Sequence, residues 1–238
     1  MTVQSREKYK IYNNVFDEFT NRNLFKLQSQ GYFDELIGAH GLGKEANIFT
    51  AKRKDGMWVI VKIYRVENCN FNKMYDYIKS DPRYEDLKGR RREIIFKWVQ
   101  REYRNLHKAR EVGVRVPTPF TFMHNIIVME LIGDDGHPAK QLKSVRLKDP
   151  KKFVDELIKQ LKTLYQKANI VHADLSPFNI LVQDEKPVLI DMSQSTSKED
   201  NNSDQYMERD LDNIITFAAK YDIVLDKQAL LKKIIGKK

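Results

Sequence analysis

Three polar side chains recur at fixed intervals within residues 170–193. Asp174 and Asn179 are separated by four residues, and Asp191 follows an apolar run further along. Together they offer two carboxylates and an amide, the hard oxygen donors that suit Mg²⁺, an ion that keeps some waters and shares its other positions with phosphate oxygens. One carboxylate function remains to accept a proton from an attacking hydroxyl or water. The segment therefore predicts a metal site for a phosphate-bearing ligand.

A small hairpin must hold these side chains in place. Apolar runs at 180–182 and 188–190 flank residues 184–187 (Asp-Glu-Lys-Pro), which are typical of turns. The two runs predict short strands, and the polar groups then lie at strand ends beside a loop. At that position the core fixes their geometry while a ligand can still reach them.

The spacing Asp-x-x-x-x-Asn, followed by a strand that ends in Asp, is the catalytic and metal-binding arrangement of protein kinases. His-Ala-Asp, ending at Asp174, stands where those enzymes have His-Arg-Asp, and Asp-Met-Ser, beginning at Asp191, stands where they have Asp-Phe-Gly. A loop whose Asp and Asn only cap turns is the alternative. The joint offsets of Asp174, Asn179 and Asp191 favour the catalytic interpretation.

A lysine and a glutamate are predicted to form a buried ion pair beside this site. Lys62 lies within the apolar strand 59–64, where an unpaired ammonium is costly to bury. Glu102 falls on the buried stripe of a helix predicted over 94–109, where a carboxylate also needs a partner. Glu93 lies at the helix start, where negative charge is favourable anyway, so Glu102 is the expected partner. Protein kinases use such a pair to hold the α- and β-phosphates of the nucleotide.

A glycine-rich segment precedes the strand that carries the lysine. Its pattern Gly38-x-x-x-x-Gly43-Lys44 resembles a Walker A loop, but Glu45 replaces the metal-binding Ser or Thr, and a strand follows instead of a helix. We therefore expect a loop that closes two strands over the nucleotide, as in kinases, with Gly43, Lys44 and Glu45 facing the ligand. Ala46 replaces the third glycine of the kinase pattern.

By analogy with protein kinases, whose adenine-binding hinge lies at this point of the chain, we expect the buried strand at 125–132 to carry the contacts to an adenine ring. It ends in a glycine breaker, and the main-chain groups of Glu130 and Ile132 are then available to the adenine edge, with Met129 beside them. Residues 133–136 (Gly-Asp-Asp-Gly) follow as a turn and mark a boundary between two lobes.

These elements predict an α+β chain with a bilobal, protein-kinase-like fold, a reduced C-terminal lobe and an N-terminal helical extension. We expect the extension at 1–34, where apolar residues recur at helical spacing. The N-terminal lobe is expected at 35–132, with a mobile insert at 67–92, and the C-terminal lobe at 133–238. Too few residues follow the last aspartate of the site for a peptide-docking platform, and no Ala-Pro-Glu motif occurs.

Composition narrows the function classes. The chain has 238 residues and a net charge of +9, and its single cysteine excludes an intramolecular disulfide and a cysteine-rich zinc site. That cysteine usage fits a reducing cytoplasm, and the longest apolar run, 57–64, is too short to span a bilayer, so no membrane partner is expected. The basic excess, dense at Lys88–Arg92, favours an acidic partner such as RNA or a nucleotide; the alternative is a solvated, lysine-rich surface.

Several motifs together resemble the RIO-type atypical protein kinases. They are, in chain order, GKEANIF, VKIY, YIKSDPRY, REYRNL, VMELIG, HADLSPFNILV and IDMSQS. The similarity runs from about Val15 to Tyr221. The IDMSQS ending and the insert that contains DPRY resemble the type-1 branch of the family, and the size resembles that of an archaeal member.

The resemblance implies an enzyme that uses ATP with Mg²⁺, or with Mn²⁺ in its place. The implied site residues are the catalytic Asp174, the metal ligands Asn179 and Asp191, the phosphate-holding Lys62 and its orienting partner Glu102. Asp191 is also the position of a phospho-aspartate in this family. Its members are cytoplasmic factors in late maturation of the small ribosomal subunit, and they act through ATP hydrolysis as much as through protein phosphorylation. The resemblance also makes Lys88–Arg92 a candidate contact to rRNA in the pre-ribosomal small subunit.

The sequence departs from conventional kinases, and rival interpretations exist. Ala173 replaces the arginine that reads a phosphorylated activation loop, so control by that route is not expected. Ser80 is the only serine between Glu67 and Ile94, so autophosphorylation there is expected to be limited.

The rival interpretations are a small-molecule phosphotransferase of the aminoglycoside- or choline-kinase kind, the small kinase of the tRNA-modifying KEOPS complex, and a nucleotide-binding scaffold without turnover. The short tail argues against the first and the DPRY insert against the second, while the physiological substrate and the oligomeric state stay open.

Overall fold

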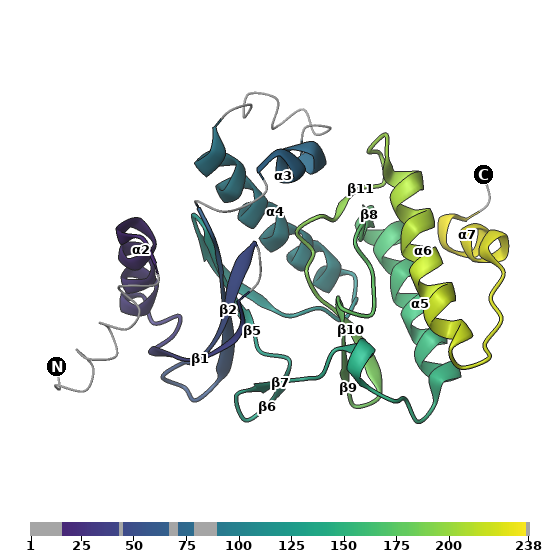
Figure 1. Cartoon of the computed structure of the whole chain (residues 1–238), viewed down its shortest axis with the longest axis horizontal. Helices are drawn as coiled ribbons and strands as arrows, with labels where there is room; N and C mark the ends of the chain where they lie inside the picture. Colours follow the sequence, from purple (N-terminus) through teal and green to yellow (C-terminus); the bar gives the residue numbers. More distant parts are fainter. Residues whose placement is uncertain (1–15, 43–44, 67–70, 79–89, 237–238) are drawn as a thin grey trace.

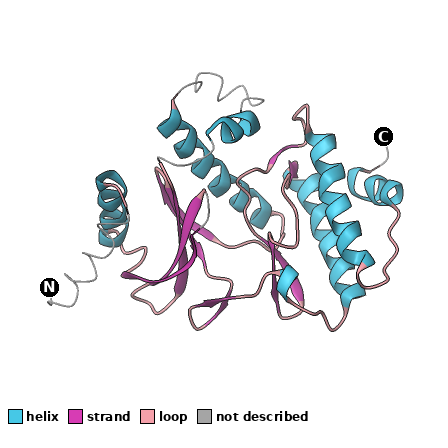
Figure 2. Ribbon diagram, in the orientation of Figure 1, coloured by secondary structure: helices cyan, strands magenta, loops and turns pink. Residues whose placement is uncertain are grey.

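The computed structural model describes residues 16–42, 45–66, 71–78 and 90–236. Its N-terminal part is built on a five-stranded antiparallel sheet with the strand order β1-β2-β3-β5-β4 (Figures 1 and 2). The strands of this sheet are β1 (Glu35–Leu42), β2 (Ala46–Lys52), β3 (Trp58–Tyr64), β4 (Pro119–Met123) and β5 (Ile126–Glu130).

Helices, three two-stranded antiparallel pairs and the loops between them make up the remainder of the described chain. The helices are α2 (Glu18–Ser29), α3 (Phe71–Ile78), α4 (Arg91–Glu111), η2 (Leu142–Ser144), α5 (Pro150–Ala168), α6 (Ser203–Ala219) and α7 (Lys227–Ile235). The short strands pair as β6 (Gly133–Asp134) with β7 (His137–Pro138), β8 (Ile170–Val171) with β11 (Thr196–Ser197), and β9 (Ile180–Gln183) with β10 (Lys186–Leu189).

Strand β3 lies at the centre of the sheet, and its alternating side chains face two separate parts of the core. Val59 and Val61 are buried in an apolar cluster that also contains Leu27 of helix α2. Tyr64, three positions after Val61, belongs instead to the cluster that contains Trp98 of helix α4. Successive side chains point to opposite faces of a strand. Lys62 therefore lies on the same face of β3 as Tyr64, the face that points toward α4.

A second, larger cluster of buried residues joins the sheet to the helices. It contains Met129 of β5, Trp98 of α4, Leu157 of α5 and Leu211 of α6. Helix α4 therefore packs against the sheet and also shares a core with the C-terminal helices. Figure 1 shows it running between the sheet and those helices. This central position lets one helix contribute side chains to both halves of the molecule.

Local sequence signals explain where the helices begin and end. The Asp17 carboxylate accepts a hydrogen bond from the N–H of Thr20, which starts α2. Asp149 caps α5 in the same way, with Pro150 in the first turn, where its missing N–H costs nothing. Helix α5 ends at Ala168, and the residue that caps it, Asn169, has a left-handed φ of 58°. The chain then enters strand β8, which leads directly to the polar segment described above.

The structure differs from the sequence expectations in three local features. The segment from Gly38 onward was expected to be a loop, but residues up to 42 belong to strand β1, with register shifts beside the glycines. The turn between β9 and β10 contains only Asp184 and Glu185, both at positive φ, so Pro187 lies within β10 and pairs with Val182. Helix α7 was not expected at all.

Part of the insert expected at 67–92 belongs to a helix. Helix α3 packs on α4, with Met74 buried, while 67–70 and 79–89 lie outside the described residues. The mobility expected for this insert and the two boundaries between the three expected domains stay predictions. Within the described ranges, no helix is both long and apolar enough to cross a membrane.

Candidate active site

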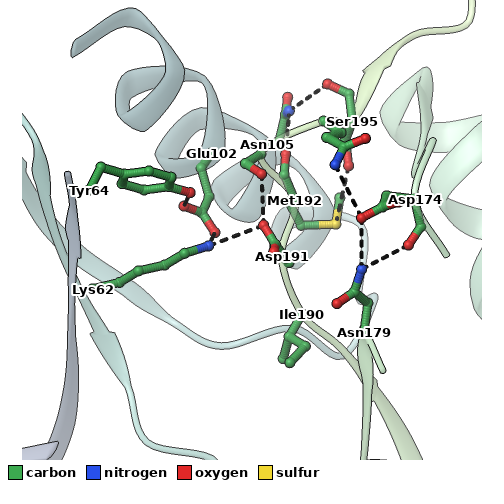
Figure 3. A network of polar contacts seen from close by, with 12 residues as sticks. Lys62, Tyr64, Glu102, Asn105, Asp174, Asn179, Ile190, Asp191, Met192 and Ser195 are labelled. Carbon is green, nitrogen blue, oxygen red and sulfur yellow. Dashed lines mark hydrogen bonds and ion pairs between the residues drawn. The ribbon is translucent and has the colours of Figure 1, made fainter. Parts of the chain in front are cut away.

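Lys62 and Glu102 form a buried ion pair between β3 and α4. The Lys62 Nζ lies 2.8 Å from Glu102 Oε1, and the hydroxyl of Tyr64 donates to the other carboxylate oxygen at 2.7 Å (Figure 3). Glu93, the alternative partner, is exposed and pairs with Arg90 instead. Burial by itself lowers the pKa of Lys62, but the charges of Asp191 and Glu102 outweigh it and raise that pKa well above its usual value. The ammonium is therefore charged at neutral pH.

Lys62 also contacts Asp191, from the other half of the molecule. Its Nζ lies 3.1 Å from Asp191 Oδ1, and the Ser193 hydroxyl donates to the same oxygen at 2.7 Å. Burial favours a raised pKa for Asp191, but the charge of Lys62 and these hydrogen bonds prevail and lower it. Asp191 has a φ of 61°, and left-handed backbone of this kind is uncommon outside glycine and is often found at functional sites.

The β9–β10 hairpin brings Asn179 close to Asp191. The N–H of Ile190 donates to the carbonyl of Asn179 at 3.0 Å, one step beyond the last paired residues of the hairpin. The Asn179 amide in turn donates to Asp174, at 2.8 Å to its carbonyl and 3.0 Å to Oδ2. Asp174, Asn179 and Asp191 therefore lie together, and Lys62 joins them across the two halves of the chain (Figure 3).

Asp210 on α6 holds the loop that carries Asp174, and the sequence reasoning missed it. Its two carboxylate oxygens accept the N–H groups of Ala173 and Leu175, each at 2.8 Å. Asn213, one turn further along α6, donates to the carbonyl of Leu175 at 2.7 Å. The available signal was an acidic residue on the buried stripe of an amphipathic helix, the same signal that identified Glu102.

His172 fixes the other side of the loop and stays neutral at physiological pH. Its Nε2 lies 3.1 Å from the carbonyl of Ile190. Burial lowers its pKa to about 4. A neutral, buried imidazole of this kind supports the loop, and the group that can accept a proton from a ligand is the carboxylate of Asp174.

Asn179 and Asp191 offer two hard oxygen donors, which are too few to enclose a metal ion but suit a Mg²⁺ ion shared with a phosphate ligand. Asn179 Oδ1 and Asp191 Oδ2 accept no hydrogen bond from the described residues. No group of three or more His, Cys, Asp or Glu side chains that could hold a metal occurs in those residues. Mg²⁺ is commonly bound by one or two protein oxygens together with waters and substrate phosphates, so this donor set fits that ion.

The other positions predicted to contact the nucleotide are less fully described. Gly43 and Lys44 lie outside the described residues. Glu45 is half-buried, and its carbonyl accepts the N–H of Arg65 at 3.0 Å. Their contacts with a nucleotide stay predictions.

The segment that follows β5 has one main-chain donor to offer. Met129 is 7% exposed and packs in the large core cluster. The Glu130 side chain points toward Thr118, and its Oε2 accepts a hydrogen bond from the Thr118 N–H at 3.0 Å. The carbonyl of Ile132 is taken by Ala139 at 2.7 Å, whereas its N–H has no hydrogen bond to any described residue. That N–H is the group best suited to bind a heterocycle.

The basic cluster is only partly described. Lys88 and the glycine after it lie outside the described residues, whereas Arg90, Arg91 and Arg92 are exposed at the start of α4. The Arg92 guanidinium lies 5.8 Å from the ring centre of Phe19.

Comparison with known proteins gives a consistent result. The model of the family described as the RIO domain matches residues 47–230. The RIO-type serine/threonine-protein kinase Rio1 of Methanocaldococcus jannaschii is 38% identical over 231 residues, covering 97% of this chain and 79% of that protein. The Rio1 kinase of Haloferax volcanii is 33% identical over 236 residues, covering 99% of this chain and 81% of that protein.

Solved structures agree with this result at the level of the fold. The Rio2 kinase of Chaetomium thermophilum, in a complex with ADP, Mg²⁺ and phosphoaspartate, aligns with a TM-score of 0.70 at 22% sequence identity. The alignment covers 90% of this chain and 66% of that one. The kinase-like α+β fold expected from the sequence is thereby confirmed.

Proposed function

The chain belongs to the RIO domain family and is a serine/threonine-type protein kinase, and on this premise we propose that it is an ATP- and Mg²⁺-dependent switch in small ribosomal subunit maturation. The observation that best supports ATP chemistry is the continuous polar network from Glu102 through Lys62 and Asp191. It joins the sheet to the β9–β10 hairpin across the space where kinases hold the triphosphate.

In this proposal each polar group has a distinct role. Lys62, held by Glu102, contacts the α- and β-phosphates, and the Ile132 N–H binds the adenine edge. Asn179 and Asp191 hold Mg²⁺, which supplies charge neutralisation at the transferring phosphate. Asp174 accepts the proton of the attacking oxygen while that oxygen bonds to the γ-phosphorus and the bond to the β-phosphate oxygen breaks, releasing ADP.

We propose water and the Asp191 carboxylate as acceptors of the phosphoryl group in addition to protein hydroxyls. The Rio2 kinase of Chaetomium thermophilum has been solved with a phosphoaspartate. Autophosphorylation on serine is proposed to be limited, because Ser80 is the only serine between Glu67 and Ile94. An enzyme that transfers phosphate mainly to water or to itself can act as a switch between two binding states.

The proposed partner is the precursor of the small ribosomal subunit, bound in the cytoplasm through its rRNA. Support comes from the net charge of +9 and from the exposed arginines 90–92. We also propose the lobe boundaries given above, with the reduced C-terminal lobe beginning at Gly133. Membership of the RIO family argues against the small-molecule phosphotransferase and KEOPS alternatives.

Single-turnover hydrolysis of γ-labelled ATP tests the proposed function. Wild type is compared with Asp174→Ala and Asp191→Ala, with Mg²⁺, in the presence and absence of small-subunit precursor particles. Asp184→Asn serves as the matched control, because Asp184 is an exposed aspartate in the turn of the same hairpin.

We expect wild type and the control to release labelled phosphate or to retain it on an acid-stable, hydroxylamine-sensitive group. Both alanine variants should lose at least about a hundredfold in rate, since each removes a group that acts in the transition state. ATP binding without movement of label under any condition would leave only a nucleotide-gated scaffold.

A further inference from the structure

Helix α4 holds the segment that follows Asp191 through side-chain hydrogen bonds to its backbone. The side chains of Arg101 and Asn105 both donate to the carbonyl of Ser195, each at 2.9 Å, and Asn105 also donates to the carbonyl of Met192 at 3.0 Å. The Ser195 hydroxyl then donates to the carbonyl of His172 at 3.0 Å. The segment is therefore fixed to α4 on one side and to the catalytic loop on the other (Figure 3).

Gln194 lies within this fixed segment, and its side chain reaches the catalytic aspartate. Its Nε2 donates to Asp174 Oδ2 at 3.2 Å, the same oxygen that accepts the Asn179 amide at 3.0 Å. Gln194 is 9% exposed, and its Oε1 is buried without a hydrogen-bond partner among the described residues. The two amides converge on one carboxylate oxygen and restrict the rotation of the Asp174 side chain.

The unpaired Oε1 indicates that the hydrogen bond to Asp174 sets the orientation of the Gln194 amide. A buried carbonyl oxygen without a partner is unfavourable, and most buried polar groups avoid it. Turning the amide over would bring Oε1 against Asp174 Oδ2, and two acceptors would then face each other. The amide keeps the orientation that serves Asp174 and leaves its own oxygen unsatisfied. This orientation is expected of a side chain whose role is to position Asp174 and not to stabilise the fold locally.

From this geometry we infer that Gln194 is a positioning residue that orients the Asp174 carboxylate for proton acceptance. Conventional kinases couple the catalytic loop to a phosphorylated activation loop through an arginine next to the aspartate, and Ala173 stands at that place here. Gln194 supplies a permanent alternative, because α4 holds its backbone in place through Arg101, whose Nη2 also approaches the Gln194 carbonyl at 3.4 Å. The orientation of Asp174 then needs no phosphorylation. The inference rests on the proposed ATP turnover.

The test compares Gln194→Met with wild type by nucleotide affinity, turnover and thermal stability. Methionine keeps the length and volume of the side chain but removes both the donor and the unsatisfied oxygen. Gln141→Ala is the matched control, because the Gln141 amide donates at 2.8 Å to the carbonyl of Phe178 and to no carboxylate in the part of the chain that the structure describes.

For Gln194→Met we expect ATP affinity within about twofold of wild type and a turnover rate roughly tenfold to a hundredfold lower, the size of effect typical of a misplaced catalytic group. We expect a melting temperature equal to or above that of wild type. The Gln141 control should keep its turnover. A merely structural role predicts the opposite split, with lowered stability and an unchanged rate in the folded enzyme.

Turnover within about twofold of wild type in Gln194→Met, or a loss of rate no larger than the loss of nucleotide binding, would overturn the inference. Gln194→Ala serves as a second variant and should lower turnover by at least the same factor. Wild-type protein that hydrolyses no ATP defeats the proposed function itself. Active wild type with unaffected Gln194 variants defeats only the positioning role.

Discussion

A double-mutant cycle on Lys62 and Glu102 measures whether their ion pair behaves as the buried pair that the structure describes. The two side chains are 10% and 1% exposed, so solvent screens their interaction little. Among the described residues, Lys62→Met leaves the buried Glu102 carboxylate with the Tyr64 hydroxyl as its one remaining partner. Removing one member of a buried pair in this way typically costs about 3–5 kcal/mol of unfolding free energy.

The other single variant, Glu102→Gln, should lose less unfolding free energy. In Glu102→Gln, Lys62 keeps the Asp191 carboxylate at 3.1 Å, so the ammonium stays paired and we expect a loss of about 1–2 kcal/mol. The double variant carries neither charge of the pair. It should be less destabilised than the sum of the single variants by about 2–3 kcal/mol, the upper range of coupling between contacting residues.

Urea unfolding near neutral pH measures the free energies of unfolding of the four proteins. Single-turnover hydrolysis on the same samples should show that all three variants have lost activity, because each disturbs the group proposed to hold the phosphates. Single-variant losses that add within about 0.5 kcal/mol would refute the reasoning, since they would mean that the two charges do not interact in the folded protein.

Three further expectations follow from other contacts. Tyr64→Phe removes one hydrogen bond to Glu102 and should lower the free energy of unfolding by about 1 kcal/mol in urea titrations; an unchanged value would mean that the hydroxyl contributes nothing. Burial raises the pKa of Asp210 to about 7, so the native state keeps a proton that the unfolded chain releases, and wild type should lose stability relative to Asp210→Asn as pH rises from about 4 to 7. Parallel melting curves across that window would contradict this. Replacing Arg90–Arg92 with glutamate should weaken binding to small-subunit precursors and reduce its salt dependence, and unchanged binding in filter assays would remove the proposed rRNA contact.

The parts of the site that sequence could predict are those set by short-range periodicity. The alternation along β3 and the three- and four-residue steps along α4 were enough to select Glu102 over Glu93 as the partner of Lys62. The offset between Asp174 and Asn179 lies within one loop, and the structure joins their side chains directly.

Contacts between distant segments were beyond such reasoning. The hydrogen bond from Arg101 to Ser195 joins residues 94 positions apart, and nothing in either segment specifies the other. The glycines of β1 read as a loop because glycine is disfavoured in strands, yet pairing with β2 overrode that preference. Asp210 carried the same signal as Glu102, but its hydrogen bonds in the described structure come from backbone N–H groups, which no residue type in the sequence marks.

Helix α4 has a consequence for how the protein could be inhibited. A compound that pushed this helix outward would have to break every contact that the helix makes with the segments around it. Here Glu102 faces Lys62 while Arg101 and Asn105 hold the segment after Asp191, so an outward shift would break both sets of contacts together. A selective compound for this protein should therefore fit the nucleotide site without displacing helix α4.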